Sequence, residues 1–331
     1  MAAVQRKTDL AAVLEKNGIL VIDGSMSTAL EAMGADLNNK LWTATVLINE
    51  PEKVKQVHKN YFKAGADCGI TASYQATVQG LIDNGYSETE AEQLLRRSIE
   101  VFCEAREEWW REEGEAAGRT YPLCLAGMGP YGVYLADGSE YTGAYVDQVS
   151  EEELYAFHRQ RAALLAGAGA DLLLFETQPS LKEATVAARV GEDLGVDYWI
   201  SFSCRDGHAT NKGEKISDCA AALSKDHPHL KMIGVNCTKP AYIVSLIQDM
   251  KKVTDLPIAV YPNSGEVYDP LTKTWTKSEE GPDFGDYALK YMAAGARAVG
   301  GCCTTVETHI RQVAAARDRY LSMGKPKLVQ L

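Results

Sequence analysis

The chain has 331 residues, of which 46% are hydrophobic and 24% are charged. These proportions are typical of a folded globular protein and exclude a disordered chain. The 34 basic and 45 acidic residues give a net charge of −11 with neutral histidines, and no Lys/Arg cluster that could follow a phosphate backbone is present. Nucleic acid is therefore excluded as a partner.

The sequence also indicates where the protein works. No segment approaches the roughly 18 unbroken apolar residues of a membrane span. The first residues mix charges with apolar positions, whereas a signal peptide needs a continuous apolar stretch. We therefore expect no membrane partner and a cytoplasmic location. The eight cysteines are too scattered for a disulfide framework and are expected to be thiols, metal ligands or catalytic groups.

The domain organisation is simple. The chain has only 11 prolines and no Ser/Gly-rich or single-charge stretch that would serve as a linker. The sequence predicts one domain over residues 1–331, with a core of about 15–320 and a C-terminal tail at 321–331.

Eight short apolar or β-branched runs are expected to be strands. In chain order they are Ile19–Gly24, Cys68–Tyr74, Pro122–Pro130, Leu172–Thr177, Tyr198–Cys204, Met232–Cys237, Pro257–Tyr261 and Ala298–Cys303. Amphipathic segments separate them, among them Pro51–Lys63, Glu88–Glu113, Glu151–Ala166, Leu181–Leu194, Ala241–Lys252 and Asp286–Ala294. This alternation predicts parallel strands joined by helices, and eight such units close a (β/α)8 TIM-type barrel.

A short repeat supports this prediction. The segments 64–67, 168–171 and 294–297 read AGAD, AGAD and AGAR, and each lies between a helical segment and a strand. A glycine there can end the helix in the left-handed conformation. An open doubly wound sheet predicts the same alternation, but no G-x-G-x-x-G follows the first strand.

The chemically active residues fall where a barrel places its active site. Such sites lie at the C-terminal ends of the strands. The expected strands end in Asp23-Gly24, Tyr74-Gln75, Glu176-Thr177, Asn236-Cys237 and Cys302-Cys303, and Asn263 follows the seventh strand.

Three cysteines reach this rim from two strands, Cys237 from the sixth and Cys302-Cys303 from the eighth. Three thiolates that leave one position open are typical of a catalytic zinc site. Neighbouring side chains on a strand point to opposite faces, so both can reach one metal only if the chain bends, which Gly300-Gly301 would permit. Buried core cysteines and a redox-active vicinal pair are the alternatives.

Six segments carry a family resemblance. They are Asp23–Thr28, Ile70–Thr77, Tyr134–Tyr141, Gly234–Cys237, Tyr261–Glu266 and Gly300–Cys303. Together they resemble the zinc-dependent homocysteine S-methyltransferases, from about Ile19 to Ala315. Within that family the chain is most similar to the single-domain branch that uses S-methylmethionine or S-adenosylmethionine.

The resemblance implies the site. Cys237, Cys302 and Cys303 match the catalytic zinc ligands, with the homocysteine thiolate in the fourth position. Glu176 matches the carboxylate that binds the substrate ammonium, and Asp23 matches a second acidic contact near it. Asp23 could instead form a strand-end turn or cap a helix ahead of the segment Met26–Met33. The remaining expected substrate-binding residues are Gly24, Tyr74 and Asn236.

The donor is a sulfonium cation, so its site should offer aromatic faces. The candidates are Trp42, Tyr74, Tyr131, Tyr134 and Tyr261, with Tyr74 preferred. We expect direct displacement, in which the zinc-held homocysteine thiolate attacks the methyl carbon in line and methionine is formed. No acid or base is required, because the leaving group is a neutral thioether, and the six histidines have no assigned role.

Other functions remain open at the level of the sequence. Glycine betaine as the methyl donor, or a selenocysteine-type compound as the acceptor, would keep the chain within the same superfamily. A non-enzymatic zinc-binding or thiol-sensing barrel is a different class and predicts four protein ligands or reversible cysteine oxidation. The expected partners are small molecules, and the oligomeric state leaves no readable pattern in the sequence.

Overall fold

The computed structural model describes residues 7–37, 43–265, 267–269, 274–276 and 283–324. Eight parallel strands lie in the order β1-β10-β7-β6-β5-β4-β3-β2. Their bounds are β1 Leu20–Val21, β2 Cys68–Ile70, β3 Leu123–Met128, β4 Leu172–Gln178, β5 Tyr198–Phe202, β6 Leu230–Asn236, β7 Ile258–Tyr261 and β10 Ala298–Val299. A parallel bridge between Ile22 and Cys68 joins the two end strands of this order. The predicted (β/α)8 barrel is confirmed.

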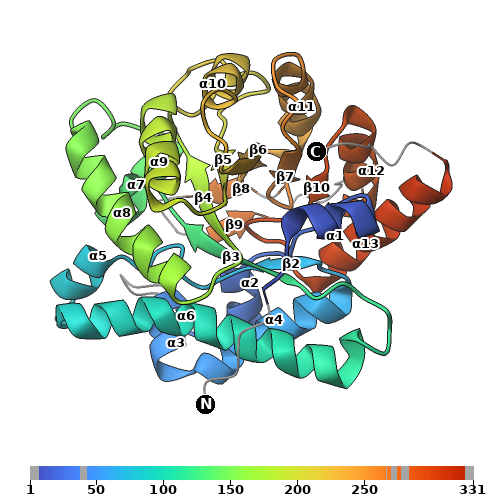
Figure 1. The fold of residues 1–331 in the computed structure, drawn as a ribbon, viewed down its shortest axis with the longest axis horizontal. Coiled ribbons are helices and arrows are strands. Elements are labelled where there is room, and N and C mark those ends of the chain that lie inside the picture. Colours follow the sequence, from blue (N-terminus) through green and yellow to red (C-terminus); the bar gives the residue numbers. More distant parts are fainter. Residues whose placement is uncertain (1–6, 38–42, 266, 270–273, 277–282, 325–331) are drawn as a thin grey trace.

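Helices surround the strands on the outside, as Figure 1 shows. All six amphipathic segments are helical, and the first of them begins at its predicted proline. The α-helices are α1 Leu10–Asn17, α2 Met26–Ala32, α3 Thr43–Asn49, α4 Pro51–Ala64, α5 Val78–Asp83, α6 Glu88–Trp109, α7 Tyr131–Leu135, α8 Glu151–Gly167, α9 Leu181–Leu194, α10 Ile216–Leu223, α11 Ile243–Lys251, α12 Phe284–Ala294 and α13 Glu307–Ser322.

Local sequence explains where several helices begin and end. Ser87 and Glu90 form a capping box at the start of α6, so two otherwise unpaired N–H groups gain partners. The glycines of the short repeat, Gly65, Gly169 and Gly295, have φ values of 114°, 104° and 115°. Each is in the left-handed region that side chains disfavour, so the predicted helix stops are confirmed.

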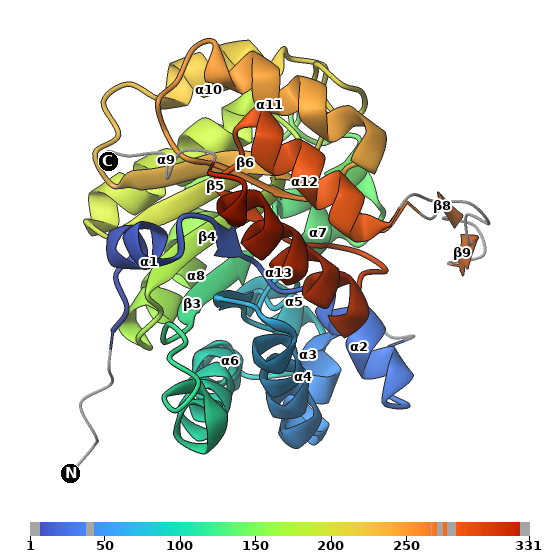
Figure 2. The ribbon, with the colours of Figure 1, turned by 90° about the vertical axis from the view of Figure 1, so that its right-hand side faces the viewer.

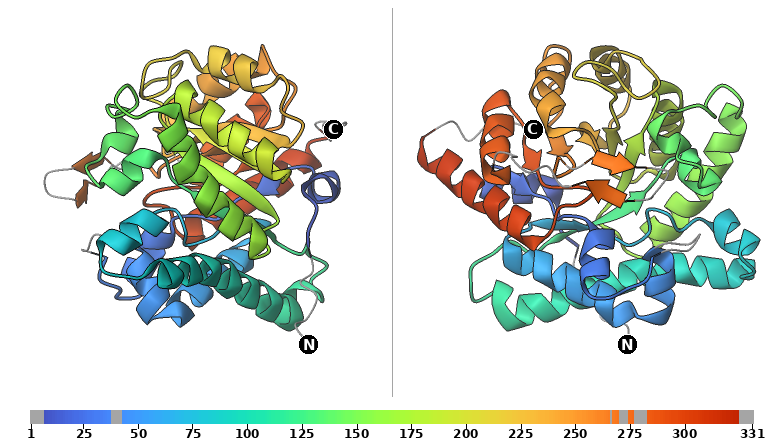
Figure 3. Two further views of the ribbon diagram at one scale, coloured as in Figure 1. Left: turned by 60° about the vertical axis from the view of Figure 1, so that its left-hand side comes forward. Right: turned by 180° about the vertical axis from the view of Figure 1, so that it is seen from behind.

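The core has two layers. The outward-facing strand residues pack against the helices in one large cluster. The inward-facing residues fill the barrel together with Leu10, Val13 and Leu14 of α1. Helix α1 therefore closes one end of the barrel, and the short hairpin β8 (Val267–Asp269) and β9 (Thr274–Thr276) lies at the opposite end (Figure 2; Figure 3, right). The sequence did not predict this hairpin.

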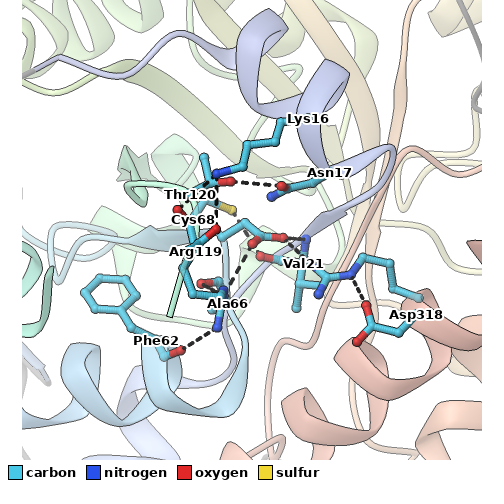
Figure 4. A network of polar contacts seen from close by, with 12 residues as sticks. Lys16, Asn17, Val21, Phe62, Ala66, Cys68, Arg119, Thr120 and Asp318 are labelled. Carbon is cyan, nitrogen blue, oxygen red and sulfur yellow. Dashed lines mark hydrogen bonds and ion pairs between the residues drawn. The ribbon is translucent and has the colours of Figure 1, made fainter. Parts of the chain in front are cut away.

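An ionic network closes the α1 end (Figure 4). Asp67 is 1% exposed and precedes β2. Its carboxylate accepts hydrogen bonds from the Val21 N–H at 2.9 Å and from Arg317 at 2.8 Å, and Arg119 lies 3.4 Å away. The Asp67 N–H in turn donates to the Val21 carbonyl at 2.8 Å. The first strand is thereby tied to the second, which is where the ring closes.

Candidate metal and substrate site

The three predicted cysteines meet at the open end of the barrel. Among the described residues, Cys237, Cys302 and Cys303 form the one group of three or more potential metal ligands, and their sulfurs lie within 4.8 Å of one another. The Cys237 and Cys303 sulfurs are 3.4 Å apart. Two thiolates on a tetrahedral zinc are separated by about 3.8 Å, because each Zn–S bond is about 2.3 Å long. The spacing suits a single metal ion.

The end of β7 holds the backbone of all three cysteines. Strand β7 lies between β6 and β10 in the sheet. The Cys237 N–H donates to the Tyr261 carbonyl at 3.2 Å, and the Cys302 N–H donates to the Pro262 carbonyl at 2.8 Å. The Ser264 N–H donates to the Cys303 carbonyl at 3.2 Å. The segment after β7 therefore sets the spacing between cysteines that are 65 residues apart in the sequence.

The two glycines before Cys302 are required by close packing and not by unusual backbone angles. Strand β10 ends at Val299, four residues before the end of the expected strand Ala298–Cys303, so both cysteines follow the strand and can face one metal. Neither glycine has a positive φ. A Cβ on Gly300 would lie 2.6 Å from the Ile22 carbonyl oxygen, and one on Gly301 would lie 2.3 Å from the Thr305 Oγ1. Glycine is needed because the backbone of this loop presses against its neighbours.

Backbone strain gathers at this end of the barrel. Of the described non-glycine residues with positive φ, four lie at or after the C-terminal ends of barrel strands, namely Ala136, Thr177, Cys237 and Thr304, whereas Asp226 precedes β6 at the other end. Cys237 itself has φ 48°, and Thr177, beside Glu176, has φ 60°. Such conformations cost roughly 1 kcal/mol or more each and are concentrated at functional sites.

Glu176 lies on an irregular stretch of β4, where the pairing with β5 shifts between Phe175 and Gln178. Asn236 fixes this stretch: its Oδ1 accepts from the Thr177 N–H at 2.8 Å, and its Nδ2 donates to the Thr177 Oγ1 at 2.8 Å. The same Nδ2 lies 3.5 Å from Glu176 Oε2 and 3.9 Å from the Cys302 sulfur. Asn236 thus links the carboxylate to the sulfur cluster.

Glu176 is 5% exposed and makes no ion pair with any described residue. Burial raises the pKa of its carboxyl to about 8, and the nearby Tyr261 hydroxyl lowers it in part. A buried carboxyl without a cation is costly in its ionised form. The ammonium group of a ligand would supply the missing positive charge and stabilise the ionised carboxylate.

Asp23 is a second buried carboxyl, 1% exposed. Its Oδ2 accepts from the Ile70 N–H at 2.9 Å, and its Oδ1 has no partner among the described residues. Burial raises the pKa of Asp23 well above its ordinary value, and the charge of Glu176 adds to the rise. Asp23 does not cap a helix, since Ser25 accepts the Thr28 N–H at the start of α2. A helix-capping role for Asp23 is therefore excluded.

Gly24 and Tyr74 complete the predicted set. A Cβ on Gly24 would lie 2.9 Å from the Tyr61 ring, so the role seen here is close packing. The half-buried Tyr74 packs against Gly129, and its carbonyl accepts from the Gly129 N–H at 3.1 Å and from Arg161 at 3.4 Å. Burial raises the pKa of the Tyr74 phenol well above its ordinary value, and the charges of Glu140, Cys237 and Glu176 add to the rise.

The other aromatic candidates lie elsewhere. The Tyr134 hydroxyl donates to Asp83 at 3.0 Å and the Tyr131 hydroxyl to Glu153 at 2.8 Å, both at the outer helices. Tyr261 is inside the barrel, with its ring 5.9 Å from that of Trp199. Trp42, like residues 325–331 of the predicted tail, lies outside the described residues. Sequence reasoning therefore named two aromatic residues, Tyr131 and Tyr134, that the described contacts do not join to the cysteines, whereas the Tyr261 carbonyl accepts from the Cys237 N–H.

It also missed one aromatic residue at the site. Tyr141 ends a 3-10 turn, Ser139–Tyr141, and its hydroxyl lies 3.7 Å from the Cys237 sulfur. The only signal was its place in the motif Tyr134–Tyr141.

Among the described residues, no helix is long and apolar enough to cross a membrane.

Comparison with known proteins agrees with this geometry. Residues 20–317 match the family model for homocysteine S-methyltransferase. The chain belongs to the homocysteine S-methyltransferase family.

Individual relatives are similar over nearly their whole length. The homocysteine S-methyltransferase YbgG of Bacillus subtilis (strain 168) is 47% identical over 304 residues, which cover 92% of this chain and 96% of the relative. The selenocysteine Se-methyltransferase of Brassica oleracea var. italica is 41% identical, covering 90% and 89%. The metallated homocysteine methyltransferase MmuM of Escherichia coli is 38% identical, has a TM-score of 0.82 and is matched over 92% of this chain and 99% of its own.

Proposed function

We propose that this protein is a zinc-dependent homocysteine S-methyltransferase that takes a methyl group from S-methylmethionine or S-adenosylmethionine and forms methionine. The observation that carries the proposal is the pairing of three clustered thiols with a buried carboxylate that has no cation. The thiols suit a metal that binds a further thiol, and Glu176 suits the ammonium group of the same amino acid. Membership of the family supports the reaction class.

The donor set fits zinc. Cys237, Cys302 and Cys303 would hold the ion, and three sulfur ligands leave one tetrahedral position for a substrate. When bound, zinc supplies the positive charge that ionises a substrate thiol at neutral pH while sulfur ligands preserve the nucleophilicity of the thiolate. Hydrogen bonding to Cys237 and burial raise the pKa of the Cys302 thiol, and hydrogen bonding to Cys303 lowers it in part. A bound cation would offset the repulsion between three thiolates whose sulfurs lie within 4.8 Å of one another.

The protein's own residues provide orientation. Glu176 and Asp23 would bind the homocysteine ammonium, and Asn236 would hold Glu176 in place. Gly24 lets the loop after β1 approach closely, and Tyr74 would face the sulfonium donor. With the amino acid fixed at one end, its sulfur can meet the donor methyl carbon in line, which converts an encounter in solution into an oriented reaction.

Proton transfer has no part in this proposal after the thiol is ionised. The carbon–sulfur bond to homocysteine forms as the bond to the donor breaks, and the leaving group is a neutral thioether. The six histidines therefore need no catalytic role. Of these, His58 and His158 are fully buried away from the sulfur cluster.

Methionine formation tests the proposal. Protein with a measured zinc content is incubated with homocysteine and either donor, before and after chelation. Zinc-dependent turnover with either donor is expected. Bound zinc without turnover from either donor would contradict the proposed donor class, and glycine betaine would then be tested.

A second acceptor is supported by one relative. The selenocysteine Se-methyltransferase of Brassica oleracea var. italica is 41% identical. A selenol ionises more readily than a thiol and would fit the same sulfur-lined position. A selenocysteine or selenohomocysteine acceptor is therefore the second candidate, and comparing kcat/KM for sulfur and selenium acceptors decides between them.

A further inference from the structure

One carboxylate near the sulfur cluster has no place in the function described so far. Glu140 lies in the 3-10 turn Ser139–Tyr141. Its Oε2 is buried without a hydrogen-bond partner among the described residues. No lysine, arginine or histidine of the described chain forms an ion pair with it, although many other carboxylates have one.

The turn is beside the reaction site. Tyr141, the next residue, places its hydroxyl 3.7 Å from the Cys237 sulfur. The turn also contacts β4, the strand that carries Glu176. Burial raises the pKa of Glu140 to about 7, and the charge of Asp137 adds to the rise. The turn thus lies beside the sulfur cluster, and the Glu140 carboxylate is close enough to the phenols of Tyr74 and Tyr141 for its charge to raise the pKa of each. These surroundings favour a cationic partner.

The position of Glu140 is built into the fold. Gly132 of α7 packs so closely that a Cβ there would lie 2.5 Å from the Glu140 nitrogen. Residues on both sides of the turn are tied to one buried carboxylate, Glu183, which accepts from the Tyr131 N–H at 2.6 Å and from the Tyr145 hydroxyl. His158 contacts the same carboxylate at 2.8 Å. These contacts hold the turn against the barrel.

We propose that Glu140 binds the α-ammonium group of the methyl donor and so contributes to donor specificity. This inference rests on the proposed function. The donor carries two cations, and they behave differently in the reaction. The sulfonium loses its charge as the methyl group leaves, so a carboxylate on it would stabilise the reactant more than the transition state.

The ammonium keeps its charge throughout, so a carboxylate on it strengthens donor binding without slowing transfer. Glu176 and Asp23 serve the corresponding group of homocysteine in the proposed function. Glu140 gives the donor its own ammonium site, while the Tyr74 ring is left to face the sulfonium. Two amino acids can then be held with their sulfurs together.

The test compares Glu140→Gln with wild type in the zinc-loaded protein. S-methylmethionine binding is measured by calorimetry and KM and kcat by methionine formation. We expect the dissociation constant and KM for S-methylmethionine to rise about 10- to 100-fold, as for a lost charge-assisted hydrogen bond. The KM for homocysteine and the zinc content should stay within about twofold, since this carboxylate faces neither in the proposal.

Asp137→Asn is the matched control. It removes a negative charge three residues away but retains the Oδ1 acceptor for the Ser139 N–H, a bond of 2.9 Å. It should leave donor binding within about twofold, since Asp137 is exposed and its charge is screened. Equal loss in both variants would overturn the proposal, because it would show a general charge effect.

A second probe separates the two cations of the donor. A dimethylsulfonium carboxylic acid that lacks the amino group should bind wild type and Glu140→Gln equally. If the variant weakens this probe as much as S-methylmethionine, Glu140 serves the sulfonium or the fold, and the proposal is wrong. If wild type binds S-methylmethionine but forms no methionine, the proposed function fails while the Glu140 assignment stands. If wild type does not bind it, both fail.

Discussion

The two ends of the barrel use the same buried residue type in opposite ways. Asp67 at the α1 end and Asp23 at the open end are each 1% exposed, and each accepts an N–H from the neighbouring strand. Asp67 also meets Arg317 and Arg119, whereas Asp23 has one oxygen without a partner among the described residues. A buried charge with its partners supplied stabilises a fold, and one without them marks a place for a ligand.

Glu176 and Glu140 extend the contrast. Neither has a basic partner among the described residues, and burial raises the pKa of each. The open end is thus built from groups whose missing partners are cations. Groups at the active site of an enzyme often lower the stability of its fold in this way.

Removing a metal ligand should give the largest effect. Cys302→Ala is expected to lose bound zinc and to reduce turnover by at least about a thousandfold, because two sulfurs no longer define the site. Metal analysis and methionine formation are measured on the same sample. Cys219→Ala, in the buried face of α10, is the control and should keep both. Full turnover of Cys302→Ala without zinc would contradict the mechanism.

Replacing each of the two aspartates by asparagine tests the comparison directly. Asp67→Asn should lower the free energy of unfolding by about 2–3 kcal/mol, because two arginines lose their carboxylate where the ring closes. Asp23→Asn should change it by less than about 1 kcal/mol, since no basic side chain depends on it. Urea denaturation measures both.

Turnover should show the reverse order. Asp23→Asn is expected to raise the KM for homocysteine, whereas the folded fraction of Asp67→Asn should have the wild-type KM. Equal loss of stability in the two variants would remove the distinction between the ends of the barrel.

Glu176 should make stability depend on pH. Its carboxyl has a pKa of 4.5 in the unfolded chain and about 8 in the folded one. Between these values the folded chain binds more protons, so the free energy of unfolding falls as pH rises from about 4.5 to about 8. Glu176→Gln should remove this contribution and, at pH 8 without substrate, be more stable than wild type by roughly 1–3 kcal/mol.

Urea denaturation at pH 6 and pH 8.5 checks the sign. The exposed Glu100→Gln is the control and should follow wild type at both pH values. The same Glu176→Gln protein should bind homocysteine about 10- to 100-fold more weakly, as expected for a lost contact with an ammonium. A variant less stable than wild type at pH 8.5 would show that the carboxyl has an unseen structural partner.

Removing the Tyr141 hydroxyl should give the smallest effect. Tyr141→Phe loses one contact of 3.7 Å to the Cys237 sulfur and keeps the ring, which is 41% exposed. Zinc affinity is expected to fall about 2- to 10-fold, the range for one neutral hydrogen bond. Competition with a chelating dye measures it, and Tyr134→Phe, whose hydroxyl meets Asp83, is the control.

Much of the site could be predicted because it lies at strand ends. Cys237, Cys302 and Glu176 follow or end apolar runs, and parallel strands in a barrel bring those ends to one rim. Tyr141 and Glu140 could not be found this way. They lie in a turn after α7, whose position is set by Gly132 and Glu183 rather than by a strand. The exclusion of Tyr131 and Tyr134 required side-chain directions, which spacing does not give.

The sequence by itself determined the eight strands, six of the helices, the glycine stops and the three clustered cysteines, because periodicity and local chain geometry decide them. The tertiary structure alone decided which buried carboxylates have partners. Asp23 ends a predicted strand and Asp67 precedes one, but the sequence does not show that Arg119 and Arg317, from distant segments, pack against Asp67 alone of the two. Charge pairing depends on what folds against a residue, and that information is spread over the whole chain.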